Sequence, residues 1–203
     1  AGVAAMDADT AQEALQLIDV EYEELPAVFD PEEAMREGAP LLHEDAKLNI
    51  AKHLYINKGD VDDAFRRADV IVEGRFATQR VHQAYLEPAG CVASWDGSGK
   101  LTVWAGSMYN SGLHSMLARV LELPVSRVRF IQPYVGGSFG SKVTLQSIYP
   151  VAAQLARLTG RPVRMINTRE EEYIATRPRV PVTLYVKTAA KRDGTLLARE
   201  ARI

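Results

Sequence analysis

Cysteine is nearly absent from this sequence, because Cys91 is the single one among 203 residues. One thiol excludes an internal disulfide, and it excludes a structural zinc or iron–sulfur site built from this chain's own cysteines. Such cysteine use is typical of a reducing compartment, so we expect the protein in the cytoplasm. His43, His53, His82 and His114 show neither HxxxH nor HExxH spacing, so we predict no metal ligand among them.

Excess positive charge and long apolar runs are also lacking. Lys and Arg number 24 against 26 Asp and Glu, which gives a formal net charge of -2, and no stretch concentrates basic residues. We therefore expect no nucleic-acid partner. No apolar run reaches the roughly 20 residues of a membrane-spanning helix, and no secretory leader is recognisable. The chain does not begin with Met, and we expect both ends to continue into a longer protein.

The first part of the chain predicts a strand–helix–strand unit. Ala1–Ala5 is interpreted as the end of a strand, and Asp9 or Thr10 as the cap of a helix that runs to about Ile18. Asp19–Leu25 alternates apolar and acidic residues, which indicates a second strand. An acidic, proline-bearing segment follows and is interpreted as a connection that contains a short helix. Within it, residues 48–57 are expected to be extended.

From residue 60 onward, strands outnumber helices. Apolar periodicity predicts strands at residues 70–78, 89–95, 100–105, 127–131, 162–166, 182–187 and 195–200. It predicts helices at residues 61–68, 111–122, 145–158 and 169–174. The turns DGSG and KRDG each indicate a hairpin. The elements mix without strict βαβ alternation, so we predict an α+β fold.

The loop Val135–Lys142, VGGSFGSK, is the most informative stretch. Gly136, Gly137 and Gly140 remove side chains where a ligand can approach the backbone, and we expect the loop to lead into a helix N-terminus that suits a phosphate or pyrophosphate. Its spacing fits neither GxxxxGK[ST] nor GxGxxG, so an anion site and a plain turn stay open as alternatives. Phe139, a large aromatic between glycines, favours a wall beside a flat or bulky ligand.

The loop resembles the GGGFGxK loop of the molybdopterin-binding large subunits of xanthine dehydrogenase, aldehyde oxidase, carbon monoxide dehydrogenase and 4-hydroxybenzoyl-CoA reductase. Other segments are similar to that family in the same order along the chain. They are EALQLIDVEYEELPAVFDPEEA, VHQAYLEP, LTVWAGSMYNSGLHSMLARVLELPVSRVRF, TGRPVRMINTREEEYIATRPRVP and LYVKTAAKRDGTLLA. The resemblance therefore spans essentially the whole chain. In the family, VHQAYLEP corresponds to a strand that carries a Glu-Pro pair.

The resemblance implies a domain organisation. Residues 1–28 would be the tail of a hammerhead-like α/β domain, 29–57 a connecting segment, and 58–203 the first part of the molybdenum-cofactor-binding domain. The family's catalytic glutamate lies several hundred residues further on, so we expect no catalytic residue and no metal ligand in this chain.

The resemblance also implies a cofactor site. Gly136, Gly137, Phe139 and Gly140 would approach the pterin, with the Phe ring next to the molybdenum. Ser138 stands where the family has a third glycine. Met108 occupies the position of a family Gln whose amide binds an oxygen on the metal, and Met cannot donate such a hydrogen bond. Val143 replaces a Glu that binds purine-like substrates in some members, which argues against xanthine as substrate.

The implied function is oxidation of an aldehyde or aromatic heterocycle with oxygen from water. The implied cofactor is molybdenum–molybdopterin, expected in its cytosine dinucleotide form, with iron–sulfur and FAD groups on partner subunits or domains. The remaining half of the molybdenum subunit is a further expected partner. The alternative is a non-catalytic cofactor-holding or assembly subunit of a split molybdoenzyme, which Met108 favours. We expect the chain alone to be catalytically inert.

Several polar and aromatic residues have simpler interpretations. Glu87 is expected to cap a turn, and Glu170–Glu172 to form the acidic first turn of a short helix. Arg177 and Arg179 are either phosphate ligands or surface charges around a turn, and we favour the second. Trp104 and Tyr134 are predicted in the core.

Overall fold

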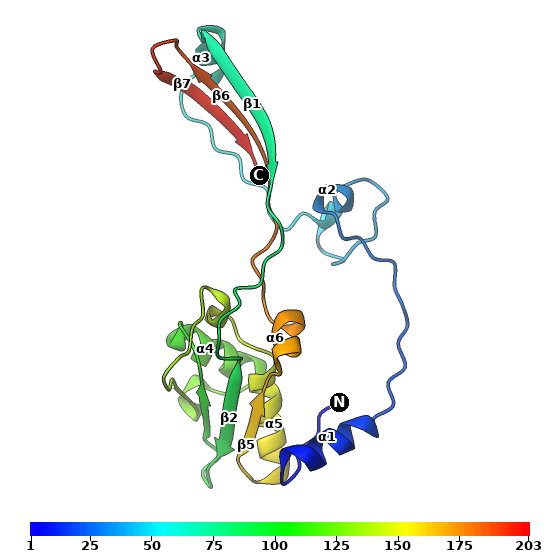
Figure 1. Cartoon of the computed structure of the whole chain (residues 1–203). Helices are drawn as coiled ribbons and strands as arrows, with labels where there is room; N and C mark the ends of the chain where they lie inside the picture. Colours follow the sequence, from blue (N-terminus) through cyan, green and yellow to red (C-terminus); the bar gives the residue numbers. More distant parts are fainter. The chain divides into compact units, whose positions relative to one another are not determined.

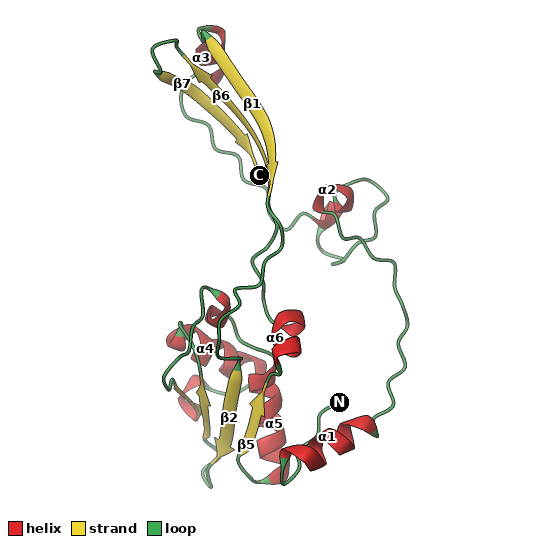
Figure 2. Cartoon of the chain, in the orientation of Figure 1, coloured by secondary structure: helices red, strands yellow, loops and turns green.

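The computed structural model describes all 203 residues and divides the chain into two compact units. Unit 1 comprises Ala1–Ile18 and Ala77–Thr183, and unit 2 comprises Asp19–Phe76 and Leu184–Ile203. Both units combine helices with strands, as Figures 1 and 2 show, so the predicted α+β class is confirmed. None of the helices combines the length and the apolar character that a membrane span requires.

Unit 1 is built around a four-stranded sheet of order β4-β3-β2-β5. Its helices are α1 (Ala8–Gln16), α4 (Asn110–Val120), α5 (Ile148–Thr159) and α6 (Arg169–Ala175). Its strands are β2 (Gly90–Trp95), β3 (Leu101–Ala105), β4 (Val128–Ile131) and β5 (Val163–Ile166), with 3-10 turns η2 (Val125–Arg127) and η3 (Ser141–Val143). β2 pairs antiparallel with β3 and β5, and β3 pairs parallel with β4. The DGSG hairpin is confirmed.

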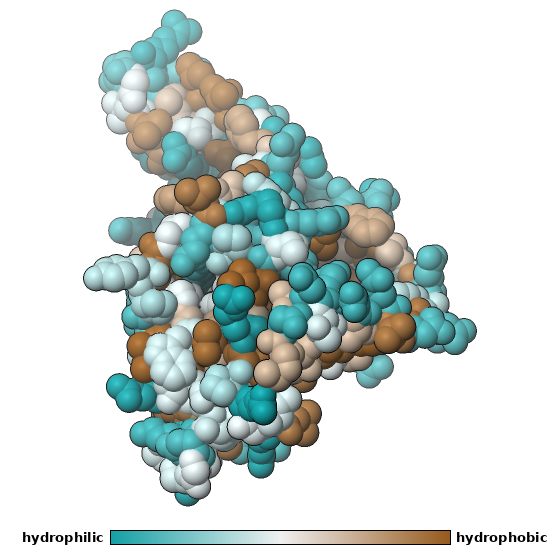
Figure 3. Space-filling view, turned by 60° about the horizontal axis from the view of Figure 1, so that its bottom comes forward, coloured by the Kyte–Doolittle hydropathy of each residue, from teal (hydrophilic) through white to brown (hydrophobic).

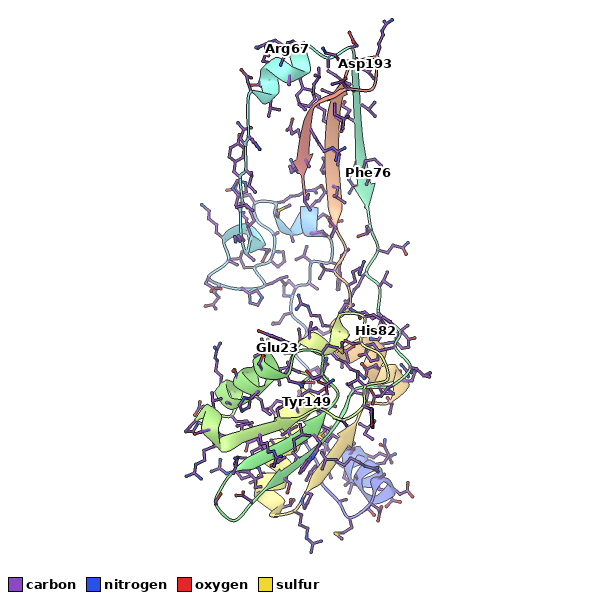
Figure 4. All side chains as sticks on the ribbon, turned by 90° about the vertical axis from the view of Figure 1, so that its left-hand side faces the viewer. Glu23, Arg67, Phe76, His82, Tyr149 and Asp193 are labelled. Atoms are coloured by element: carbon purple, nitrogen blue, oxygen red, sulfur yellow. The ribbon has the colours of Figure 1, made fainter.

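The core of unit 1 lies between this sheet and helices α4 and α5. Leu101 and Val103 of β3 face it, together with Leu113 and Leu117 of α4. Burying each of these leucines contributes roughly 1.5–3 kcal/mol. Small residues of α5 let this helix approach the sheet closely: Ala152, Ala153 and Ala156. Tyr149, labelled in Figure 4, is fully buried, and its hydroxyl donates to the Gly106 carbonyl at 3.1 Å.

Unit 2 contains a three-stranded sheet of order β1-β6-β7. Its strands are β1 (Val70–Ala77), β6 (Thr183–Ala190) and β7 (Leu196–Arg202), and its helical segments are α2 (Pro31–Ala34), η1 (Lys47–Asn49) and α3 (Val61–Arg66). β6 and β7 pair antiparallel across the predicted KRDG turn. Asp60 caps α3 through a 2.9 Å bond from the Asp63 N–H. The helix and the hairpin predicted here are confirmed.

The strands predicted at Ala1–Ala5 and Asp19–Leu25 are wrong, because neither segment has regular structure. The helix between them exists, but its cap is Asp7, which accepts from the Thr10 N–H at 2.8 Å. The expectation that 48–57 is one extended segment missed η1. A strand needs a second strand to pair its backbone groups, and alternation of residues alone does not supply one.

Three further expectations are corrected. The family strand carrying VHQAYLEP is reduced to an isolated bridge between Val81 and Arg179. Trp104 is 38% exposed, because alternate residues of β3 point to opposite faces and Leu101, Val103 and Ala105 take the core face. Tyr134 follows β4 and is fully exposed. Figure 3 shows brown, hydrophobic areas among teal, hydrophilic ones on the face in view.

Candidate functional site

The glycine loop between β4 and α5 has a left-handed backbone at three of its positions. The φ angles are 101° at Gly137, 48° at Phe139 and 97° at Gly140. Glycine adopts such angles without a steric cost, but Phe139 has a Cβ and carries strain of about 1–2 kcal/mol. The residue is 73% exposed. Strained residues of this kind cluster at ligand-binding sites.

Glu87 holds the start of this loop in place. Its carboxylate accepts the Gly136 N–H at 2.8 Å, and its own N–H donates to the Gly136 carbonyl at 3.2 Å. A Cβ at position 136 would lie only 2.6 Å from the Glu87 Cβ, so this close approach requires glycine. The prediction that Glu87 is a structural residue near a turn agrees with these contacts, although the turn that it holds is the glycine loop.

Lys142 holds the other end of the loop. Its side chain is 1% exposed, and its Nζ lies 2.5 Å from Glu87 Oε2 and 4.9 Å from the centre of the Tyr85 ring. A buried ammonium needs such partners. Partial burial alone raises the pKa of Glu87, but hydrogen bonds from Lys142 and from the Gly136 N–H, with the Lys142 charge, outweigh burial and hold that pKa below its ordinary value.

Ser138 has a structural role that a glycine could not fill. The residue is 5% exposed, and its hydroxyl accepts the Lys142 N–H at 3.0 Å. Its carbonyl accepts the Ser141 N–H at 3.0 Å. The serine side chain therefore fits inside the loop at the position of the family's third glycine. Its hydroxyl supplies an acceptor for the buried Lys142 N–H.

The loop does not lead directly into a helix, contrary to expectation. η3 overlaps its last residues, and α5 begins only at Ile148, so α5 does not present its free N–H groups at the glycines. The loop has free donors of its own. The backbone N–H groups of four successive residues, Gly137 through Gly140, donate to no protein acceptor. A ligand with oxygen acceptors suits such a row.

Met108 lies beside this loop. Its backbone N–H donates to the Lys142 carbonyl at 3.0 Å, and the residue is 60% exposed. The structure therefore places Met108 against the end of the loop that carries Gly136, Gly137, Phe139 and Gly140. The same hydrogen bond places Met108 near Val143, which is 37% exposed.

Tyr85, Arg169 and Glu172 were missed by sequence reasoning. Tyr85 is 1% exposed, and its hydroxyl donates to Glu172, whose side chain is completely buried. Glu170–Glu172 do form the first turn of α6 as predicted, but Glu172 differs from its exposed neighbours by what it contacts. No feature of the sequence REEEY separates these three glutamates, because the separation depends on which face of α6 is covered.

Other predicted or possible sites lie apart from the loop. Arg177 and Arg179 are exposed and take part in no ion pair. No group of three or more His, Cys, Asp or Glu side chains is placed to hold a metal ion. A surface cavity of about 540 Å³ lies along β1, β6 and β7 of unit 2 and includes none of the loop residues.

Known proteins resemble this chain in sequence and in structure. A family model described as a molybdopterin cofactor-binding domain matches residues 42–203. The nicotinate dehydrogenase large molybdopterin subunit of Eubacterium barkeri is 40% identical over 196 residues, or 97% of this chain and 45% of that protein. The xanthine dehydrogenase molybdenum-binding subunit of Escherichia coli O157:H7 is 33% identical over 195 residues, or 96% of this chain and 26% of that protein.

Among solved structures, the reconstituted CO dehydrogenase from Oligotropha carboxidovorans superposes with a TM-score of 0.85 and 32% identity, over 97% of this chain and 26% of that chain. The chain thus spans between about a quarter and just under half of the length of these relatives. The family model covers most of the chain and includes the whole glycine loop. This chain belongs to the molybdopterin cofactor-binding domain family.

Proposed function

We propose that the chain is the cofactor-holding part of a molybdenum hydroxylase large subunit. In the whole protein, the reaction would oxidise an aldehyde or an aromatic heterocycle with oxygen taken from water. One observation carries the proposal. The loop is held from inside by Glu87 and Lys142, while the Phe139 side chain and the free N–H groups of Gly137, Phe139 and Gly140 remain available to a ligand.

The residues that would hold the cofactor are Gly136, Gly137, Phe139, Gly140 and Met108. They fit such a group because nothing lies within 4 Å of a Cβ built at Gly140, so the backbone there is open to close approach. When bound, molybdenum–molybdopterin supplies the redox chemistry. The part played by this chain is to bind and orient the cofactor and to shape its electrostatic surroundings. Phe139 would form a wall beside it.

The proposal also covers the form of the cofactor, the partner cofactors, the compartment and the domain organisation. We expect the cytosine dinucleotide form of the cofactor, iron–sulfur and FAD groups on partner subunits or domains, and a cytoplasmic setting. Residues 1–28 are proposed as the tail of a hammerhead-like domain, 29–57 as a connection and 58–203 as the first part of the cofactor domain. We expect the catalytic base outside residues 1–203, so this chain purified alone should turn over neither an aldehyde nor a purine.

Metal and pterin analysis of the full-length protein from its native host tests the proposal. We expect molybdenum and pterin in equal amounts, and a Phe139→Ala variant with a reduced content of both. Phe29→Ala is the matched control, because Phe29 is 95% exposed in unit 2 and lies outside the loop. A full-length protein without molybdenum and pterin, or a Phe139→Ala protein with unchanged content, would contradict the proposed site.

The second candidate is a non-catalytic cofactor-holding or assembly subunit of a split molybdoenzyme. Met108 favours it, since a thioether cannot donate the hydrogen bond that an amide would give at this position. The downstream sequence in the same reading frame separates the two candidates. A continuing frame that encodes the second half and its glutamate supports the enzyme. A stop codon after Ile203, with the second half encoded elsewhere, supports the split subunit.

A further inference from the structure

Helix α6 carries a fully buried carboxylate, that of Glu172, which accepts hydrogen bonds from three donors. Glu172 accepts hydrogen bonds from the Tyr85 hydroxyl, from the Ala89 N–H at 2.7 Å and from Asn167 Nδ2 at 3.2 Å. Burying a carboxylate is costly unless its acceptor sites are filled. Two of the three donors belong to the segment Tyr85–Ala89, so the buried carboxylate mainly holds that segment.

Arg169, at the start of the same helix, holds the same segment from its backbone. Its guanidinium donates to the Tyr85 carbonyl at 2.9 Å and to the Leu86 carbonyl. A planar guanidinium is suited to bridging two acceptors in this way. Helix α6 therefore contacts Tyr85–Ala89 at four points, which are two backbone carbonyls, one backbone N–H and one side-chain hydroxyl.

The segment held by α6 in turn holds the glycine loop. Glu87 bonds both backbone groups of Gly136 and the ammonium of Lys142, as described above. The Tyr85 Cβ lies 3.0 Å from a Cβ built at Gly137. The Tyr85 hydroxyl is 3.2 Å from Ser141 Oγ. Because the phenol proton goes to Glu172, a hydrogen bond in that contact is donated by Ser141, whose hydroxyl also has the Arg177 carbonyl as an acceptor at 3.5 Å.

We propose that Arg169 and Glu172 are positioning residues that hold the glycine loop in its cofactor-binding conformation, through Tyr85 and Glu87. They touch no loop residue themselves, and each acts through the Tyr85–Ala89 segment. The inference rests on the proposed function, because it assumes that the loop is where the cofactor binds. The capping box formed by Thr168 and Glu171 does not involve Glu172, so we expect α6 to remain a helix when the Glu172 carboxylate is replaced.

The test compares Glu172→Gln with Glu170→Gln in the full-length holoenzyme. Glu170 lies in the same helical turn and is exposed, which makes it the matched control. Amide hydrogen exchange is measured at Gly136, Ser141 and Lys142, with the amides of α4 as an internal reference. In Glu172→Gln the loop amides should exchange roughly tenfold faster, since one buried acceptor bond is lost, while α4 stays protected. In Glu170→Gln neither should change.

Two cofactor measurements separate positioning from general stability. These are the rate at which pterin is lost on gel filtration and the molybdenum EPR signal of the dithionite-reduced protein. Faster exchange in the loop, faster pterin loss and an altered EPR signal, with α4 unchanged, support the inference. Unchanged loop exchange in folded Glu172→Gln overturns it. If the loop amides exchange faster but pterin retention and the molybdenum EPR signal are normal, Glu172 does position the loop. The proposed function is then contradicted, because the loop is not where the cofactor binds.

Tyr85→Phe is the second variant and serves if Glu172→Gln does not fold. It removes only the hydroxyl that links Glu172 to Ser141 and keeps the ring under Lys142. The amide of Ser141 should then exchange faster and that of Leu117 should not. Equal exchange of Ser141 in Tyr85→Phe and in the unaltered protein would overturn the inference. Arg169→Lys should act in the same direction, because an ammonium cannot bridge two carbonyls in the geometry of a guanidinium.

Discussion

Lys142 Nζ lies 2.5 Å from the carboxylate of Glu87, which is 55 residues earlier in the chain. The two members of this ion pair differ in burial, since the Lys142 side chain is 1% exposed and that of Glu87 is 41% exposed. Removing Glu87 is therefore expected to lower the free energy of unfolding by a different amount from removing Lys142. The lysine depends on the glutamate for its charge partner, whereas the glutamate also has solvent and the Gly136 N–H.

Glu87→Gln should destabilise the protein more than Lys142→Met does. The first change leaves a buried ammonium without a counter-charge and should cost roughly 2–3 kcal/mol of the free energy of unfolding. The second removes the buried charge, fills similar space and should cost less than about 1.5 kcal/mol. Urea denaturation of the full-length protein measures both. Arg67→Gln, which removes a surface ion pair with Asp63, is the control and should change stability by less than about 0.5 kcal/mol. A larger loss in Lys142→Met than in Glu87→Gln contradicts the asymmetry.

The stabilising contribution of Glu87 should depend on pH with a definite sign. Its pKa in the folded protein is held below the ordinary value of 4.5, so the folded state favours the ionised carboxylate. The contribution is then fully present above about pH 4.5 and is lost as the pH falls through the folded-state pKa. The stability difference between the unaltered protein and Glu87→Gln should be constant from pH 7 to 5 and shrink below that. A difference that grows on acidification would have the opposite sign to this linkage. Denaturation midpoints measured at stepped pH decide the matter.

Gly136→Ala should disturb the glycine loop without affecting the core of unit 1. The added methyl group would meet the Glu87 Cβ at 2.6 Å, so either Glu87 or the loop must shift, at a cost of about 1–3 kcal/mol. Gly97→Ala is the matched control, because nothing lies within 4 Å of a Cβ there and its φ is not positive. We expect a lower melting temperature and a lower pterin content for Gly136→Ala alone. Equal behaviour of the two variants would mean that Glu87 does not constrain the loop.

Ser138→Ala should cost about 1–2 kcal/mol, because the buried N–H of Lys142 loses its acceptor. Ser126→Ala is a suitable comparison, since Ser126 is exposed in η2. Thermal unfolding of both variants, followed by circular dichroism, checks the expectation. If Ser138→Ala melts together with Ser126→Ala, the serine hydroxyl contributes nothing to the loop, and its departure from glycine is neutral.

Local signals in the sequence predicted much of the fold. The short helix α3 and the two hairpins depend on residues a few positions apart, and all are present. The predicted strand at Asp19–Leu25 is absent, because the alternation of apolar and acidic residues does not show whether a second strand is available to pair with it. The predicted start of α5 was three residues early because the chain first forms η3. Trp104 and Tyr134 lie at the surface and not in the predicted core, because the type of a residue does not decide which face of the fold it occupies.

The candidate site divides in the same way. The sequence by itself determined the glycine loop, its Phe139 and its family resemblance, because glycine spacing and collinear motifs are local properties that can be recognised without packing. Only the tertiary structure decided which residues hold the loop. Glu87 and Lys142 meet across 55 residues, and Tyr85 and Glu172 meet across 87. The physical reason is that the sequence shows the charge and size of a side chain, whereas its burial and its partner depend on how distant segments pack.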